Sequence, residues 1–356
     1  MNNFKDAILD KLTIVICSYN RHTYLKRTIK YFSKFNINLV ILDGSDFKLE
    51  DPCINSENIR YVYNKKSFYD RLLSSPNYIN TEFMILGCDD EFYLPSSLKS
   101  CIEFLINQPS FSSCGGRSLG FSTDEKNIYG IKQYPKLKNI KLDHESIIER
   151  IEQHFANYVP AHMYSVMRTR NWKIICKYVF EKEYSFFAAM ELQIEFLNIV
   201  SGKSKIIQKL LWMRNKEVPG IRGTGPSMIQ SMTISNWWSN KIYKKEKDDF
   251  LFRMKNASKE LSKNQNSVIS EDIISKIFEN YIFGFLAAKP SSILFVIFKR
   301  LIPYKIKKIL KIFLLKKIKF KNLIEEVNLL ESEGVKVDYK DLNLIISSLK
   351  YSINNK

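Results

Sequence analysis

Short apolar runs alternate with amphipathic stretches along the first 107 residues. The runs are four or five residues long, rich in β-branched or aromatic side chains and bounded by polar turns, which is typical of buried strands. Apolar positions at helical spacing follow the first run, and Pro95 can open another helix after the last one. Alternating strands and helices predict an α/β fold with a mostly parallel sheet. The predicted strands are Thr13–Cys17, Leu39–Leu42, Ile59–Tyr63 and Phe83–Leu86.

The pattern changes beyond this region. Residues 108–140 contain several glycines, so we expect loops with short strands there. Residues 143–213 predict helices, with Asp143 as the N-cap of the first one. Residues 219–226 are rich in glycine and proline, and from about residue 232 onward the pattern is helical and rich in lysine.

The composition is that of a globular protein with a strong positive charge. Hydrophobic residues make up 45% of the 356 residues and charged residues 26%, which excludes wholesale disorder, collagen-like repeats and a coiled-coil rod. The length suggests two domains, or one large domain with an appendage. Lys and Arg number 55 against 37 Asp and Glu, a net charge of +18. Such an excess indicates polyanionic partners: nucleic acid, an anionic membrane face or phosphorylated substrates.

Several classes of site and segment are excluded by spacing. The six cysteines form no CxxC pair, so we expect reduced cysteines in a cytoplasmic protein. The four histidines lack zinc-site spacing, no GxSxG elbow indicates a serine hydrolase, and we expect His162 to be packed or exposed rather than to face a cleft. The N-terminal residues do not resemble a signal peptide, and the apolar run Ile293–Phe298 is far shorter than the roughly 18–20 residues that span a bilayer.

Polar residues directly follow the predicted strands, where open α/β sheets bind their ligands. Asp89, Asp90 and Glu91 follow the fourth strand and could hold a divalent cation together with substrate phosphates. The alternative is a solvated acidic turn. Asp43 follows the second strand and could accept hydrogen bonds from a ribose or a base, or it could form an Asx turn.

These segments resemble a known family. The runs TIVICSYNR, LVILDGSD and FMILGCDDEFYLP are similar to the opening strand, the second-strand aspartate and the DxD region of family 2 glycosyltransferases of the bacterial surface-polysaccharide type, which have the GT-A fold. The resemblance is clear over about residues 11–120 and thinner over 150–215. It implies an α/β GT-A domain followed by a mainly helical C-terminal region.

The resemblance implies roles for individual residues. Ser18, Tyr19 and Arg21 would line the nucleotide pocket, and Asp43 would contact the base or ribose of a sugar nucleotide. Lys65, just after the third strand, is assigned to nucleotide-sugar binding with them.

The metal region departs from the family pattern at one position. Cys88 stands where the first aspartate is usual, which leaves Asp90 as the main ligand for Mn²⁺ or Mg²⁺ and Glu91 as a supporting one. Asp89 falls in the variable position and is assigned to nucleotide-sugar binding.

The catalytic base implied by the family is a carboxylate 11 residues before a glycine, and Glu191 stands at that distance from Gly202. The usual acidic residue before it is replaced by Met190. The alternative is an exposed glutamate paired with Gln193 or Glu195 on a solvated helix face. A base would take the proton of the acceptor hydroxyl in an inverting transfer.

Two arginines are candidates for stabilising the leaving diphosphate: Arg214 and Arg222. Arg222 lies in the run GIRGTG, which is not a dinucleotide fingerprint because no strand precedes it. We interpret this run as a loop that closes over bound diphosphate, and the alternative is an idle surface loop.

Residues Ser291–Asn322 interleave aliphatic residues with lysine and arginine, as an interfacial helix does at an anionic membrane. A basic helix that covers the catalytic domain and a nucleic-acid-binding segment are the alternatives. We favour the membrane surface because no nucleic-acid motif accompanies the charge.

The sequence therefore predicts a cytoplasmic glycosyltransferase, peripheral at the inner face of the membrane, that moves a sugar from a nucleotide-sugar donor to a surface-glycan or lipid-linked acceptor. Inversion with divalent-metal assistance is the expected mechanism, and no nucleic-acid partner is expected. A nucleotidyl- or polyol-phosphate transferase and a non-enzymatic basic scaffold are the alternatives. The predicted parts are a nucleotide-sugar-binding half at 1–125, an acceptor and catalytic half at 126–231, and a helical basic region at 232–356.

Overall fold

The computed structural model describes residues 7–124, 126–216, 232–262, 269–288 and 321–354. Two predictions fall on the other residues. Arg222 with the rest of the GIRGTG run lies outside the described residues, and so does the basic region Ser291–Asn322 up to residue 320.

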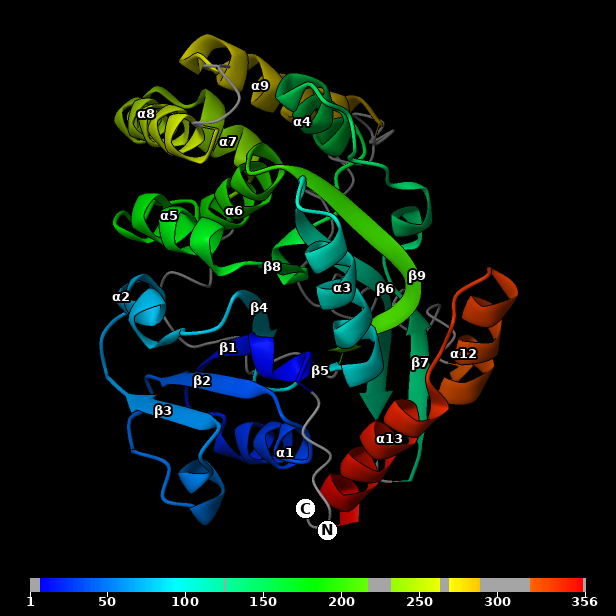
Figure 1. Cartoon of the computed structure of the whole chain (residues 1–356). Coiled ribbons are helices and arrows are strands. Elements are labelled where there is room, and N and C mark those ends of the chain that lie inside the picture. Colours follow the sequence, from blue (N-terminus) through cyan, green and yellow to red (C-terminus); the bar gives the residue numbers. More distant parts are fainter. Residues whose placement is uncertain (1–6, 125, 217–231, 263–268, 289–320, 355–356) are drawn as a thin grey trace, which may run out of the picture.

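The described strands form one mixed sheet whose first half is parallel, as predicted (Figure 1). The strands of this half lie in the order β3-β2-β1-β4. All predicted strands of this half are confirmed to within one or two residues at each end. Their bounds are β1 Leu12–Ser18, β2 Asn38–Asp43, β3 Ile59–Tyr63 and β4 Phe83–Cys88.

Helices cover both faces of the parallel strands, which is why these strands are almost continuously apolar. In β1, Val15 packs into the core on one face, while Ile14 and Ile16 pack into the core on the other. The core that contains Val15 includes helices α2, α5 and α6. The core that contains Ile14 and Ile16 includes α1 and α3. The bounds are α1 His22–Phe32, α2 Phe68–Ser74, α3 Pro95–Asn107, α5 Thr169–Phe180 and α6 Ala189–Val200.

The second half of the sheet is largely antiparallel and differs from the sequence prediction. Residues 108–140 hold one long strand rather than only short ones, and residues 203–213, predicted as helix, belong to a strand that pairs with it. Lysines interrupt the apolar residues in the first half of this segment, so it lacks the compact apolar run by which the parallel strands are predicted. The bounds are β5 Phe92–Tyr93, β6 Phe111–Thr123, β7 Ile128–Lys132, β8 Val166–Arg168, β9 Lys203–Asn215 and β10 Lys321–Asn322.

Glycine is required where β6 and β9 approach each other. A Cβ atom on Gly116 would lie 2.6 Å from Leu211 Cβ and 2.8 Å from the Lys209 carbonyl oxygen. Replacing Gly116 with alanine is therefore expected to lower the free energy of unfolding by about 1–3 kcal/mol, the usual cost of overpacking.

The matched control is Gly284 in α9 (Glu271–Ala288), where a Cβ atom would meet nothing within 4 Å. There the same change should raise the free energy of unfolding by about 0.5–1 kcal/mol, because alanine favours a helix over glycine. Denaturant unfolding of both variants tests the pair. Equal stability of the two would contradict the described packing of β6 against β9.

Helix α4 (Ile147–Ala156) begins later than predicted. Ser146, not Asp143, is the N-cap, and its side chain accepts a hydrogen bond from the backbone N–H of Glu149. The pair Ser146 and Glu149 has the spacing of a capping box, which outweighs the earlier aspartate.

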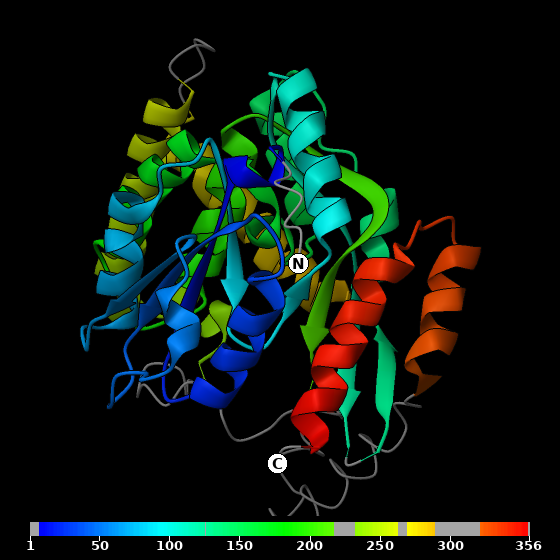
Figure 2. The same ribbon diagram turned by 60° about the horizontal axis from the view of Figure 1, so that its bottom comes forward.

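The predicted helical C-terminal region is confirmed for the described residues, and it packs on both halves of the molecule. Helix α8 contacts α5, and helix α9 contacts α4. At the other half, α13 contacts α1 and α12 contacts β7 (Figure 2). The predicted boundaries near residues 125 and 231 stay a prediction. Among the described helices, none is long and apolar enough to cross a membrane. The remaining bounds are α7 Ile234–Ser239, α8 Lys244–Leu261, α12 Leu323–Ser332 and α13 Tyr339–Asn354, with short 3₁₀ helices at η1 Leu9–Lys11, η2 Pro52–Asn55, η3 Ser75–Tyr78, η4 Pro135–Asn139, η5 His162–Tyr164 and η7 Lys241–Tyr243.

Candidate active site

The acidic segment leaves the sheet where β4 ends. Cys88 is the last residue of β4, and after Glu91 the chain re-enters the sheet as β5, which pairs antiparallel with β9. Tyr93 pairs with Trp212, and the Tyr93 hydroxyl donates to the Leu86 carbonyl at 2.6 Å. This pairing holds the acidic turn between the ends of β1 and β9.

The carboxylates of Asp89 and Asp90 are paired with Arg21. Nη1 of Arg21 lies 3.2 Å from Asp89 Oδ1, and its Nη2 donates to Asp90. Ser18 donates to Asp89 Oδ2 at 2.8 Å. Asp89 is only 3% exposed and Glu91 7%. The alternative of a solvated acidic turn is therefore wrong: Asp89 and Glu91 are buried, and Asp89 is held by Ser18 at the end of β1 and by Arg21 just after it.

Glu91 faces the end of β9. Trp212 Nε1 donates to Glu91 Oε2 at 2.7 Å, and Arg214 Nε lies 3.5 Å from Glu91 Oε1. The Arg214 guanidinium lies 5.3 Å from the centre of the Trp212 ring, within cation–π distance. The structure thus brings Ser18, Arg21 and Arg214 to the acidic segment, as the sequence predicted for one site.

Burial makes these acids weak. It raises the pKa of Asp89 to about 7, against the lowering effect of Arg21. It also raises the pKa of Glu91 to about 7, and the charge of Asp90 adds to this rise. A cation near these carboxylates would stabilise their charged forms and return both pKa values toward the normal range.

Three side chains could hold a cation here. One ligand atom each of Cys88, Asp90 and Glu91 lies within 4.8 Å of the others. The two carboxylates suit Mg²⁺ or Mn²⁺, whereas a thiolate prefers softer metals. Burial raises the pKa of the Cys88 thiol well above its usual value, so the thiol is protonated near neutral pH. The donor set fits a hard cation held by Asp90 and Glu91, with Cys88 beside it. Sequence analysis placed Cys88 only as a departure from the family pattern.

Asp43 is fully buried and has protein partners on both oxygens. Ser45 N–H donates to Oδ1 at 2.9 Å, which makes the Asx turn considered above. Tyr61 donates to Oδ2 at 2.6 Å, and His22 Nε2 lies 3.0 Å from the same atom. A ribose contact by Asp43 stays a prediction, and it would have to replace one of these partners.

A buried arginine lies behind the ends of β1 and β2, and sequence analysis missed it. Arg71 Nη1 donates to the carbonyl oxygens of Ser18 and Leu42, both at 2.7 Å. It is 5% exposed, and a Cβ atom on Gly44 would lie 2.5 Å from its Cζ, so a side chain there would require the guanidinium to shift. Its signal in the sequence was a charge on the otherwise apolar inner stripe of α2, beside Tyr69 and Leu72.

Tyr19 and Lys65 lie farther out. The Tyr19 hydroxyl donates to Asp46 Oδ1 at 3.2 Å, and Lys65 is exposed on the loop after β3. Both remain on the side of the sheet where its parallel strands end. Their contact with a nucleotide stays a prediction.

Glu191 lies in the first turn of α6, and the helix is buried along almost all of its length. Gln193 and Glu195 are fully buried, so the alternative of a solvated helix face is wrong. Tyr158 donates to Glu191 Oε1 at 2.9 Å. Burial raises the pKa of Glu191 to about 7, while the hydrogen bond from Tyr158 lowers it.

One aromatic residue connects Glu191 with the acidic strand end. The Tyr164 ring lies 4.5 Å from that of Trp212, the residue that donates to Glu91. Burial raises the pKa of Tyr164 well above its usual value, and the charges of Glu91 and Glu191 raise it further. Tyr164 also packs against both hydrophobic cores. Glu91 and Glu191 therefore act on the same side chain from two parts of the fold, which no local sequence pattern indicated.

His162 is packed, as expected. It is fully buried, and its Nδ1 lies 3.1 Å from Ser204 Oγ. All six cysteines are free, as predicted, and three of them are buried.

Comparison with known proteins gives distant structural likeness. No protein-family model matches the sequence, and no curated protein matches it. The crystal structure of S. aureus TarS 1-349 is similar with a TM-score of 0.48 and 14% identity, over 79% of this chain and 74% of that one. The same fragment in complex with UDP gives a TM-score of 0.47 and 11% identity, over 76% of this chain and 71% of that one. The complex of this fragment with UDP-GlcNAc gives a TM-score of 0.46 and 14% identity, over 77% of this chain and 73% of that one. Likeness at this level assigns no activity to the chain, and the family 2 resemblance stays a prediction from the residues.

Proposed function

We propose that this protein is a glycosyltransferase that transfers a sugar from a nucleotide-sugar donor. The observation that carries the proposal is the buried acidic cluster of Cys88, Asp90 and Glu91 at the end of β4, flanked by Arg21 and Arg214. Carboxylates with arginines at the carboxyl ends of parallel strands suit a divalent cation and a diphosphate together.

In this proposal Asp90 and Glu91 would hold Mn²⁺ or Mg²⁺. The cation supplies charge stabilisation for the leaving group. Arg21 and Arg214, which pair with these carboxylates, are placed to bind phosphate oxygens once the cation takes up the acidic charge. Ser18 and Asp89 complete the wall next to β1.

Glu191 is the proposed general base. The acceptor hydroxyl loses its proton to Glu191 as its oxygen bonds to the anomeric carbon, while the bond from that carbon to the diphosphate oxygen breaks. Attack from the face opposite the leaving group inverts the anomeric centre. In this proposal the donor sugar lies between the acidic segment and Glu191, near Tyr164, whose ring packs against Trp212.

The Tyr158 hydroxyl is a positioning group whose effect is visible in the pH profile. A base must be unprotonated, so the transfer rate should rise with pH through about 7, the pKa of Glu191. The hydrogen bond from Tyr158 lowers this pKa, so Tyr158→Phe should raise it and move the acid limb of kcat to higher pH. The rate at high pH should change much less.

The control for this shift is Tyr178→Phe. The Tyr178 hydroxyl bonds to Glu260 at 2.9 Å, away from Glu191, so its loss should leave the profile unchanged. A Tyr158→Phe variant that loses rate equally at every pH would show a structural role only.

We further propose a surface glycan or a lipid-linked glycan as the acceptor, and a peripheral location at the inner face of the cytoplasmic membrane. This rests on the basic and aliphatic composition of residues 291–322.

Product analysis tests the proposed function. Radiolabelled sugar nucleotides are incubated with the protein, Mn²⁺ and candidate glycan acceptors. Glycosyl transfer leaves the sugar on the acceptor and releases a nucleoside diphosphate or monophosphate. Transfer of the nucleotide with release of sugar 1-phosphate, or transfer of a polyol phosphate when its nucleotide donor is supplied instead, would identify the other transferase classes. Steeply salt-dependent binding to generic nucleic acid, with no product, would indicate a scaffold.

A further inference from the structure

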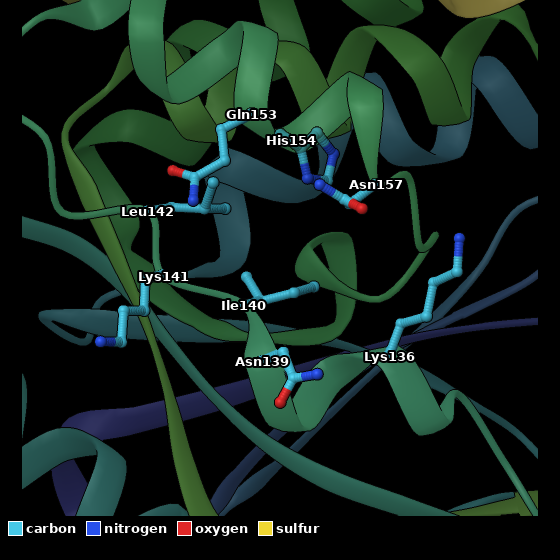
Figure 3. Close-up of a pocket in the computed structure, with 8 residues that line it drawn as sticks. All are labelled: Lys136, Asn139, Ile140, Lys141, Leu142, Gln153, His154 and Asn157. Carbon is cyan, nitrogen blue, oxygen red and sulfur yellow. The ribbon is translucent and has the colours of Figure 1, made fainter. Parts of the chain in front are cut away.

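A cavity lies apart from the candidate active site at the end of β4. It has a volume of about 200 Å³ and lies between the segment of residues 136–142 and helix α4 (Figure 3). None of its lining residues belongs to the candidate active site. A volume below the roughly 300–1,000 Å³ of drug-sized sites limits an occupant to about one sugar ring.

The rim of this cavity is positively charged. Lys136 and Lys141 lie at its two ends, and no carboxylate lines it (Figure 3). Among the described residues neither lysine forms an ion pair. Asn139 and Asn157 add exposed amides between them. The rim therefore attracts a small anion.

The wall formed by α4 carries buried polar atoms that lack partners. Gln153 Oε1 and His154 Nδ1 are buried and accept no hydrogen bond. His154 is 2% exposed, and its Nε2 lies 3.0 Å from Glu195 Oε2 without forming a hydrogen bond, so both ring nitrogens lack a hydrogen-bond partner. Burial lowers the pKa of His154 to about 3, so the ring is neutral. Buried polar atoms without partners are costly unless a ligand or water supplies hydroxyl groups, which can both donate and accept.

The remaining lining is apolar. Ile140 and Leu142 face the cavity between the charged rim and α4 (Figure 3). Such side chains can pack against the C–H face of a sugar ring.

We propose that this cavity binds a small hydroxylated anion about the size of one sugar ring, such as a sugar phosphate or a sugar acid. Its anionic group contacts the lysine rim, and its hydroxyls form hydrogen bonds with Gln153 and His154. The ligand is either a free metabolite or a charged unit of a glycan. The inference stands independently of the proposed transferase activity.

Titration of the full chain with defined probes tests the proposal. Isothermal titration calorimetry compares glucose 6-phosphate and glucuronate with glucose and with inorganic phosphate. We expect one of the two hydroxylated anions to bind at least 10-fold more tightly than both glucose and phosphate. Binding of free glucuronate or glucose 6-phosphate indicates a metabolite, whereas preferential binding of an oligosaccharide that ends in glucuronate indicates a glycan unit.

Variants locate the binding. The double variant Lys136→Gln with Lys141→Gln, and separately Gln153→Leu, should each weaken binding at least 10-fold. Lys138→Gln is the matched control, because Lys138 is exposed on the same η4 segment but does not line the cavity. Melting temperatures of all variants establish that they fold. Unchanged binding in folded variants, equal affinity for phosphate alone, or no binding of any probe would overturn the proposal.

Discussion

Replacing Asp90 with asparagine is expected to reduce sugar transfer at least about 100-fold, which corresponds to about 2.7 kcal/mol. Asparagine keeps the shape of the side chain but loses the charge that would hold the proposed cation. Asp90 is the one of the three clustered ligands that also pairs with Arg21 and accepts from Asn215 Nδ2 at 3.2 Å. The change therefore affects the cation and the arginine that faces the diphosphate. Steady-state rates at saturating donor and Mn²⁺ measure the effect.

The control for this variant is Asp248→Asn, the same change at an exposed position of α8. It should leave transfer unchanged. The Asp90→Asn protein should still fold, because Arg21 keeps its pairing with Asp89. Full activity of a folded Asp90→Asn variant would remove this residue from the site.

Replacing Glu191 with glutamine should lower kcat about 10²- to 10⁴-fold, the usual contribution of a general base. Glutamine can still accept the hydrogen bond from Tyr158 through its amide oxygen, so α6 should keep its place. Donor binding should change little, because Glu191 is not among the residues clustered at the end of β4. A loss of kcat with nearly constant donor affinity is the signature of a group that acts on the acceptor proton.

The matched control is Glu152→Gln, the same change at an exposed position on α4. Its rate should equal that of the native protein. A Glu191→Gln variant with native kcat would show that another group takes the proton. A Glu191→Gln variant with native kcat but weaker donor binding would assign Glu191 to donor binding instead.

The parallel half of the sheet could be predicted because its signal is local. Each strand from β1 to β4 is a compact apolar run, since helices cover both faces. The strand β9 could not be predicted in the same way. Lysines interrupt the apolar residues in its first half, and the segment becomes part of the sheet by pairing with the glycine-rich β6. Pairing between segments that are distant in sequence is not visible in the residue pattern of either segment alone.

The site shows the same division between local and long-range signals. Asp89, Asp90 and Glu91 were predictable because acidic residues follow a strand directly. The contacts of Arg71 and Tyr164 could not be predicted, because their partners are distant in sequence. These partners are Ser18, Leu42, Trp212 and the two glutamates. Glu191 was placed by a family spacing, whereas its burial and its bond to Tyr158 come from tertiary packing.

Thermal stability of the purified protein with nucleotides tests the central claim most directly. UDP, GDP, CDP and CMP are each added with and without Mn²⁺, to the native protein and to Asp90→Asn. A ligand at 100 times its Kd adds about 2.7 kcal/mol to the free energy of unfolding. The account predicts that one nucleotide stabilises the native protein only with Mn²⁺, and that Asp90→Asn loses this effect. Stabilisation by no nucleotide, or equal stabilisation of both proteins without Mn²⁺, would contradict a cation-dependent nucleotide site at the end of β4.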